Sequence, residues 1–191
     1  MSPTKPVPVE QALKDTQRWL ERAVIGLNLC PFAKAVHVRG QIHYAVYEEA
    51  EEGGLLDALL GEAHALADCD AAERDTTLLI APNTLTDFLD FNDFTARAER
   101  RLARAGFDGQ LQLASFHPCF QFAGAEIDDI TNATNRAPYP TLHLLREESV
   151  SRAVEAFPEA EAIFGRNIET LERLGHEGWA ALGVGPHGAA S

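Results

Sequence analysis

Apolar residues recur at intervals of three and four in several stretches of the chain, which predicts amphipathic helices. These stretches are residues 9–27, 55–67, 88–105 and 158–175. Thr84 and Asp87 have the spacing of a capping box ahead of the third stretch. Pro158 suits the first turn of the last helix. Gly106 and Gly175 each follow an apolar stripe, as expected where a helix ends.

Short runs rich in β-branched and apolar residues predict strands between these helices. The runs are Gln41–Tyr47, Thr76–Ala81, Leu111–Phe116 and Thr141–Leu145. The resulting order is α-β-α-β-α-β-loop-β-α-α. Because helices separate most of the strands, we expect an α/β fold with about four strands in a largely parallel or mixed sheet covered by helices. We predict one globular domain over residues 9–183, a flexible N-terminal lead over 1–8 and a flexible tail over 184–191.

Composition narrows the choice of partners. The formal charge is −13 and the sequence pI is about 4.9. Such an acidic chain is not expected to bind nucleic acid or an anionic membrane surface. No apolar run approaches the roughly 18 residues of a membrane span, and the first residues lack the apolar core of a signal peptide. Three widely spaced cysteines form neither a disulfide framework nor a metal-binding pair, so we expect a cytoplasmic protein.

The segment from Phe116 to Glu147 is the strongest candidate for a functional site, because it is long, polar and flanked by strands. His117 directly follows the third strand, where a group that titrates near neutrality suits acid–base chemistry. Its alternative role is a hydrogen bond to a neighbouring turn. His143 alternates with Leu142 and Leu144, so it faces either a ligand or a second layer of the protein.

Polar side chains within this segment fall at helical spacing and form a potential pocket wall. They are Asp128, Asp129, Asn132, Asn135 and Arg136. Carboxylate, amide and guanidinium groups together can hold a hydroxyl- or phosphate-bearing ligand. Capping of a helix or turn is the alternative role of Asp129 and Asn132.

Arg136 and Arg146 predict contact with an anion, because a guanidinium binds carboxylate or phosphate in a bidentate manner. The prolines on either side of Tyr139 stiffen the chain and would fix Tyr139 and Arg136 in position. Internal ion pairs with Asp128, Asp129 or Glu147 are the alternative for both arginines.

Cys30 precedes Pro31 at the expected start of a short helix. Unpaired amide groups at a helix N-terminus lower the pKa of a thiol, which predicts a reactive nucleophile. A small buried side chain that only packs is the alternative.

Four strings of the chain resemble one bacterial family, the domain of unknown function 1415. They are Ile25–Phe32, Ala114–Ala125, Asp128–Glu147 and Arg166–Gly175. The resemblance spans about residues 24–182 and implies one compact domain, but the family has no established activity that could be transferred to this chain. The chain departs from the family pattern at Cys119 and Phe120, where an acidic residue and a tyrosine are expected. This departure speaks against an indispensable role for Cys119.

Three classes of function follow from these residues. The first is an enzyme or binding protein for a small anionic metabolite, with His117 and Cys30 as catalytic groups. The second is a zinc or iron site built from His117, Asp128, Asp129 and His143. The third is a non-catalytic scaffold or interaction protein. No sequence motif for a cofactor is present.

Overall fold

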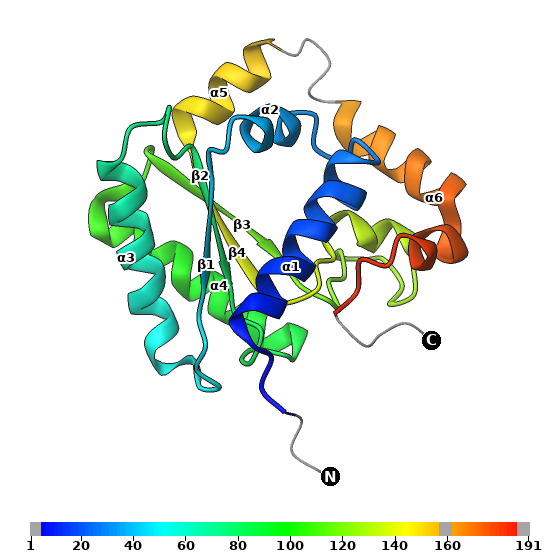
Figure 1. The fold of residues 1–191 in the computed structure, drawn as a ribbon, viewed down its shortest axis with the longest axis horizontal. Helices are drawn as coiled ribbons and strands as arrows, with labels where there is room; N and C mark the ends of the chain where they lie inside the picture. The colour runs from blue at the N-terminus through cyan, green and yellow to red at the C-terminus, as the bar shows by residue number, and fades with distance from the viewer. Residues whose placement is uncertain (1–4, 157–161, 187–191) are drawn as a thin grey trace.

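The computed structural model describes residues 5–156 and 162–186, and its elements follow the predicted order. The long helices are α1 (Val9–Trp19), α3 (Leu55–Asp68), α4 (Phe88–Leu102), α5 (Glu147–Ala156) and α6 (Ile163–Ala181), shown in Figure 1. The shorter ones are η1 (Leu20–Ile25), α2 (Ala33–Val38), η2 (Glu52–Gly54), η3 (Ala103–Phe107) and η4 (Ile130–Asn135). The strands are β1 (Ile42–Val46), β2 (Thr76–Ile80), β3 (Leu111–Phe116) and β4 (Thr141–Arg146).

The four strands form one mixed sheet in the order β1-β2-β4-β3. β1 and β2 are parallel and are joined through α3, as a parallel pair requires. β4 returns from the long loop after β3 and runs antiparallel to both β2 and β3. The prediction of an α/β fold with a mixed sheet is therefore confirmed, and β4 lies between β2 and β3.

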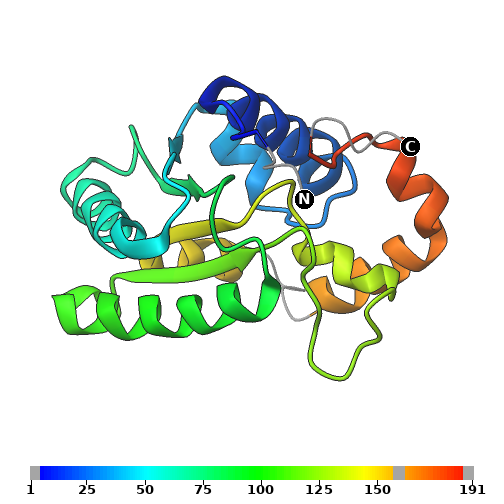
Figure 2. The same cartoon turned by 90° about the horizontal axis from the view of Figure 1, so that it is seen from below.

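Two helices cover one face of the sheet. Leu79, Leu142 and Leu144 point to this face and pack against α3 and α4 in the largest apolar cluster. The buried residues that α3 and α4 contribute are Leu55, Leu59, Ala63, Leu66, Phe91, Phe94, Ala98 and Leu102. Figure 2 shows α4 on this side of the sheet and α1 on the other. Each strand residue directed to this face is flanked by residues directed to the opposite face.

The opposite face is only partly covered. Trp19 and Ala12 of α1 pack over one half of it, against Phe116 and Tyr139 respectively. α2 and α5 lie at the end of the sheet where β1 begins (Figure 1). Between these three helices the other half of the face stays open.

Some local predictions need correction or fall outside the described residues. The N-cap of α4 is Asp87, whose carboxylate accepts from the N–H groups of Leu89 and Asp90, so Thr84 does not begin this helix. Pro158 lies outside the described residues, as do residues 1–4 and 187–191 of the predicted flexible ends. The adjoining Val7 donates its N–H to Asn83 at 2.8 Å, and Val184 is buried beside α1. In the described part of the chain, no helix combines the length and apolar character needed to cross a membrane.

Candidate functional site

A cavity of about 1000 Å³ occupies the open half of the sheet face, and we call it the sheet cavity. Its floor includes Leu78 of β2, Ala114 of β3 and His143 of β4, which are neighbours across the strands. Its walls come from α1, η1, α2 and α5 and are predominantly apolar. The volume lies at the upper end of what small-molecule sites occupy.

His143 is the polar group at the centre of this floor. Its Nε2 lies 2.6 Å from Oγ1 of Thr76, and that hydroxyl donates to the carbonyl oxygen of Leu144 at 2.6 Å. Because the hydroxyl hydrogen is engaged with Leu144, Oγ1 accepts the hydrogen of Nε2. Nδ1 therefore carries a lone pair, and no residue in 5–156 or 162–186 donates to it.

The electrostatics of His143 keep this lone pair available. Burial lowers the pKa of His143 from 6.5 to about 4, so the imidazole is neutral at neutral pH. The side chain is partly exposed, and this exposure is to the cavity. A neutral imidazole of fixed tautomer is an acceptor for a hydroxyl or N–H group of a ligand.

Cys30 lines a wall of the same cavity. α2 begins three residues later, at Ala33, and not at Pro31 as the sequence suggested. Burial raises the pKa of the Cys30 thiol, while the N–H groups of Phe32 and Ala33 act in the opposite direction. The expectation of a lowered pKa was thus wrong in direction, because the loss of hydration outweighs the amide groups of so short a helix.

Arg146 also lines the cavity, but the hydrogen bonds of its guanidinium go to the main chain. It donates to the carbonyl oxygens of Leu66, Cys69 and Arg74, which closes the C-terminal end of α3. Among the described residues, none of the alternative partners Asp128, Asp129 and Glu147 forms an ion pair with this group. Its observed role is to satisfy carbonyls that a helix end leaves without a partner.

His117 lies on the other side of the sheet and is completely buried. Its Nε2 donates to the carbonyl oxygen of Leu85 at 3.0 Å, and its Nδ1 accepts the N–H of Cys119 at 3.0 Å. The ring packs against Phe88 and Phe91 of α4. Burial lowers the pKa of His117, and the bond to Leu85 partly offsets this. Both nitrogens are engaged, which favours the structural alternative over acid–base chemistry.

The polar residues of the 117–136 loop bind the loop to itself. Asn132 accepts the N–H of Phe122 and donates to the carbonyl of Glu126. Arg136 donates to the carbonyl oxygens of Phe120 and Ile127. These contacts fold the loop into a compact unit in which neither side chain faces the sheet cavity.

The remaining predicted residues are also separate from the sheet cavity. Asp129 is the N-cap of η4, and the hydroxyl and N–H of Thr131 lower the pKa of its carboxyl group. Asn135 donates to the carbonyl of Ser115, and Asp128 is exposed. The hydroxyl of Tyr139 donates to the buried carboxylate of Asp15 at 2.6 Å, which fixes the chain beneath α1.

The structure therefore brings Cys30, His143 and Arg146 to one cavity and leaves His117 and the loop residues elsewhere. The residues of the hypothetical metal site do not assemble, because His117 and His143 face opposite sides of the sheet. Within the described residues, no group of three or more histidine, cysteine, aspartate or glutamate side chains could hold a metal ion.

Sequence reasoning missed Thr76 and Arg39. Thr76 sets the tautomer of His143, but its role depends on the pairing of β2 with β4. Arg39 follows α2 at the cavity and is exposed, and no ion-pair partner for it occurs in the part of the chain that the structure describes. Basic residues at the C-terminal end of a predicted helix would have been the available signal.

The fold and the sheet cavity together define a single-sheet α/β protein with one open face. The chain belongs to the family described as a protein of unknown function (DUF1415), whose match covers residues 11–181. Searches of curated proteins and of solved structures found no match.

Replacement of Asn132 by alanine is expected to lower the free energy of unfolding by about 2 kcal/mol, because this buried amide loses its hydrogen bonds to the N–H of Phe122 and the carbonyl of Glu126. Chemical denaturation measures this change. Asn92→Ala, an exposed amide on α4, is the matched control and should change the stability by less than about 0.5 kcal/mol. Equal stabilities of the two variants would contradict the role assigned to Asn132.

Proposed function

We propose that this protein binds a small organic molecule, with an apolar body and an anionic end, in the sheet cavity. The observation that carries the proposal is the unpartnered Nδ1 of His143 on the floor of an otherwise apolar cavity. This acceptor is open to the cavity and meets no donor among the described residues, so a ligand hydroxyl or N–H group can bind to it.

The apolar lining supports the body of this ligand. Trp19 and Phe116, whose ring centroids are 5.1 Å apart, form one side of the cavity. Val150, Ala153 and Ala156 of α5 form another. Apolar walls with few polar groups favour an aliphatic or aromatic body, since burial of such a surface contributes about 25 cal/mol per Å².

Arg39 supports the anionic end. Arg152 also lies at the cavity, but it is paired with Glu148 at 2.9 Å. Arg146 is occupied by main-chain carbonyls. Arg39 is therefore the guanidinium most available to a ligand carboxylate or phosphate. Asp70 and Asp75 also line the cavity and would discriminate against a ligand with two anionic groups.

The positions of Cys30 and His143 in the sheet cavity also limit the chemistry that they can perform. Cys30 stays a protonated thiol at neutral pH because burial raises its pKa. Because His143 is only weakly basic, it is better suited to accept a hydrogen bond than to act as a strong general base. We therefore propose binding as the primary function, with Cys30 as a wall of the cavity.

A panel of aromatic and medium-chain carboxylates, each matched with its primary amide, tests this proposal. Carboxylates that fit should raise Tm and slow the alkylation of Cys30, because an occupied cavity stabilises the native state and shields the thiol. Alkylation is followed by mass spectrometry in a Cys69→Ser, Cys119→Ser background. Ala114→Phe, which fills the floor of the cavity, should abolish both effects.

Arg39→Gln is expected to weaken carboxylates about three- to five-fold and to leave the amides unchanged. Arg104→Gln, an exposed arginine beyond α4, is the control for loss of one positive charge. A panel in which nothing slows Cys30 alkylation or raises Tm would favour the scaffold alternative over ligand binding.

A further inference from the structure

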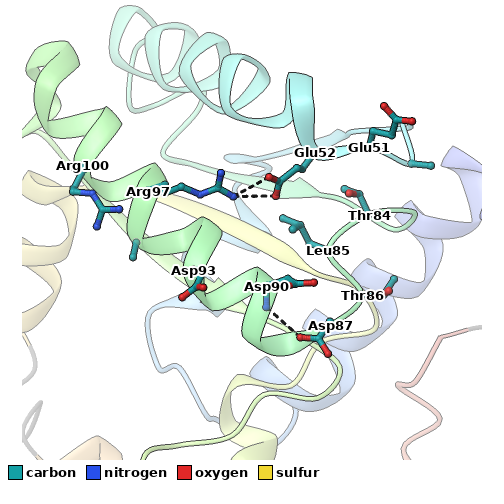
Figure 3. A pocket seen from close by; sticks show the side chains of 12 residues that line it. Glu51, Glu52, Thr84, Leu85, Thr86, Asp87, Asp90, Asp93, Arg97 and Arg100 are labelled. Atoms are coloured by element: carbon teal, nitrogen blue, oxygen red, sulfur yellow. Dashed lines mark hydrogen bonds and ion pairs between the residues drawn. The ribbon is translucent and has the colours of Figure 1, made fainter.

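A second pocket lies at the opposite end of the sheet, and we call it the strand-end pocket. It has a volume of about 950 Å³ and is formed by the segments that follow β1 and β2 together with one side of α4, from Asp90 to Arg100 (Figure 3). The carboxyl ends of neighbouring parallel strands are where ligands bind in open α/β sheets. None of its lining residues belongs to the sheet cavity.

Carboxylates dominate this pocket. Glu51, Asp90 and Asp93 line it, and their side chains have no hydrogen-bond or ion-pair partner among residues 5–156 and 162–186. Glu52 is paired through both oxygens with Arg97 at 3.0 Å. Arg100 stands at the far end of the pocket from Asp87 and Asp90 (Figure 3). The end next to Asp90 therefore carries a negative potential.

Thr84 gives an observation independent of these charges. Its residue is only 5% exposed, it lines the pocket, and its hydroxyl meets no hydrogen-bond partner anywhere in the described chain. Figure 3 shows its side chain beside Leu85, on the side of the pocket that faces Glu52. This hydroxyl is open to the pocket, where it supplies a hydrogen-bonding group to a bound molecule.

The main chain holds Thr84 in place. The next residue, Leu85, has a φ of 52°, a left-handed conformation that is uncommon for a side chain of this kind. Its carbonyl accepts the hydrogen bond from the buried His117 at 3.0 Å. The wall of the strand-end pocket is thus anchored in the core between β3 and α4.

From these observations we infer that the strand-end pocket binds the alkylammonium group of a small linear diamine. An ammonium group has three N–H donors, for which Thr84 Oγ1 and the carboxylate of Asp90 offer acceptors, while Glu51 and Asp93 add negative charge to the pocket. Leu85 and Ala96 provide an apolar surface for the carbon chain. The strand-end pocket is separate from the sheet cavity, so diamine binding here does not depend on the proposed function.

Calorimetric titration with 1,4-diaminobutane and 1,5-diaminopentane tests the inference, with the diols of equal length as neutral controls. The diamines should bind saturably and at least about tenfold more tightly than the diols, and added salt should weaken them. Absence of saturable binding, or equal binding of the diols, would overturn the inference.

Two substitutions locate the binding. Thr84→Val should reduce diamine affinity about five-fold or more, yet leave Tm nearly unchanged, because valine removes a hydroxyl that bonds to no described residue at nearly constant volume. Asp90→Asn should weaken binding by a similar factor. Asp108→Asn removes the same charge at the other end of α4 and should have little effect. Equal losses of diamine affinity in Asp90→Asn and Asp108→Asn would show that the protein attracts diamines by net charge alone. This result would contradict the assignment of the binding site.

Discussion

Acidification from pH 7 to pH 4 is expected to lower the free energy of unfolding by about 3 kcal/mol through His143 alone. Burial lowers the pKa of His143 from 6.5 to about 4 in the folded protein. The unfolded chain therefore takes up the proton first, as the pH falls through 6.5. The stabilising contribution is complete above pH 6.5 and is lost progressively down to about pH 4, where the folded protein begins to bind the proton too.

Urea denaturation of wild type and of His143→Gln at pH 7 and at pH 4 measures this contribution. The glutamine cannot titrate, so the variant should lose about 3 kcal/mol less than wild type over this interval. It should retain some acid sensitivity, because burial also lowers the pKa of His117. His64→Gln, at an exposed position of α3, should match the wild-type profile. Identical profiles for all three proteins would contradict the buried, neutral state of His143.

The elements of the fold were predictable because their patterns are local. Alternation in Thr141–Leu145 and the apolar stripe of α3 each specify an element from a few neighbouring residues. The position of β4 between β2 and β3 was not predictable, because strand pairing depends on contacts far apart in the chain. The late start of α4 has a similar cause: Asp87 caps it, and Thr84 turns into the strand-end pocket instead.

The candidate site was harder to predict than the fold. A long polar loop indicated function, but much of its polarity serves the loop itself, since Asn132 and Arg136 satisfy backbone groups that no strand or helix pairs. His143 was correctly placed on the face away from the apolar layer. The cavity around His143 was not predictable, because it depends on the strand register that places His143 beside Leu78 and Ala114.

His117 is the residue for which the structure and the sequence differ most, and substitution by alanine distinguishes the two roles. His117→Ala should lower the free energy of unfolding by about 4 kcal/mol. The change leaves a void beside Phe88 and Phe91 and removes the hydrogen bonds of the buried ring to the carbonyl of Leu85 and the N–H of Cys119. His37→Ala, at a partly exposed position of α2, should change the stability by about 0.5 kcal/mol or less.

The two roles also predict different binding behaviour. If His117 is purely structural, the His117→Ala variant keeps an intact sheet cavity at temperatures below its lowered Tm. Carboxylates should then still protect Cys30 from alkylation in this variant. Diamine affinity should fall, because the carbonyl of Leu85 loses the hydrogen bond that holds the wall next to Thr84. If His117→Ala instead has wild-type stability and carboxylates no longer protect its Cys30, then His117 belongs to the functional site, as its position directly after β3 first suggested.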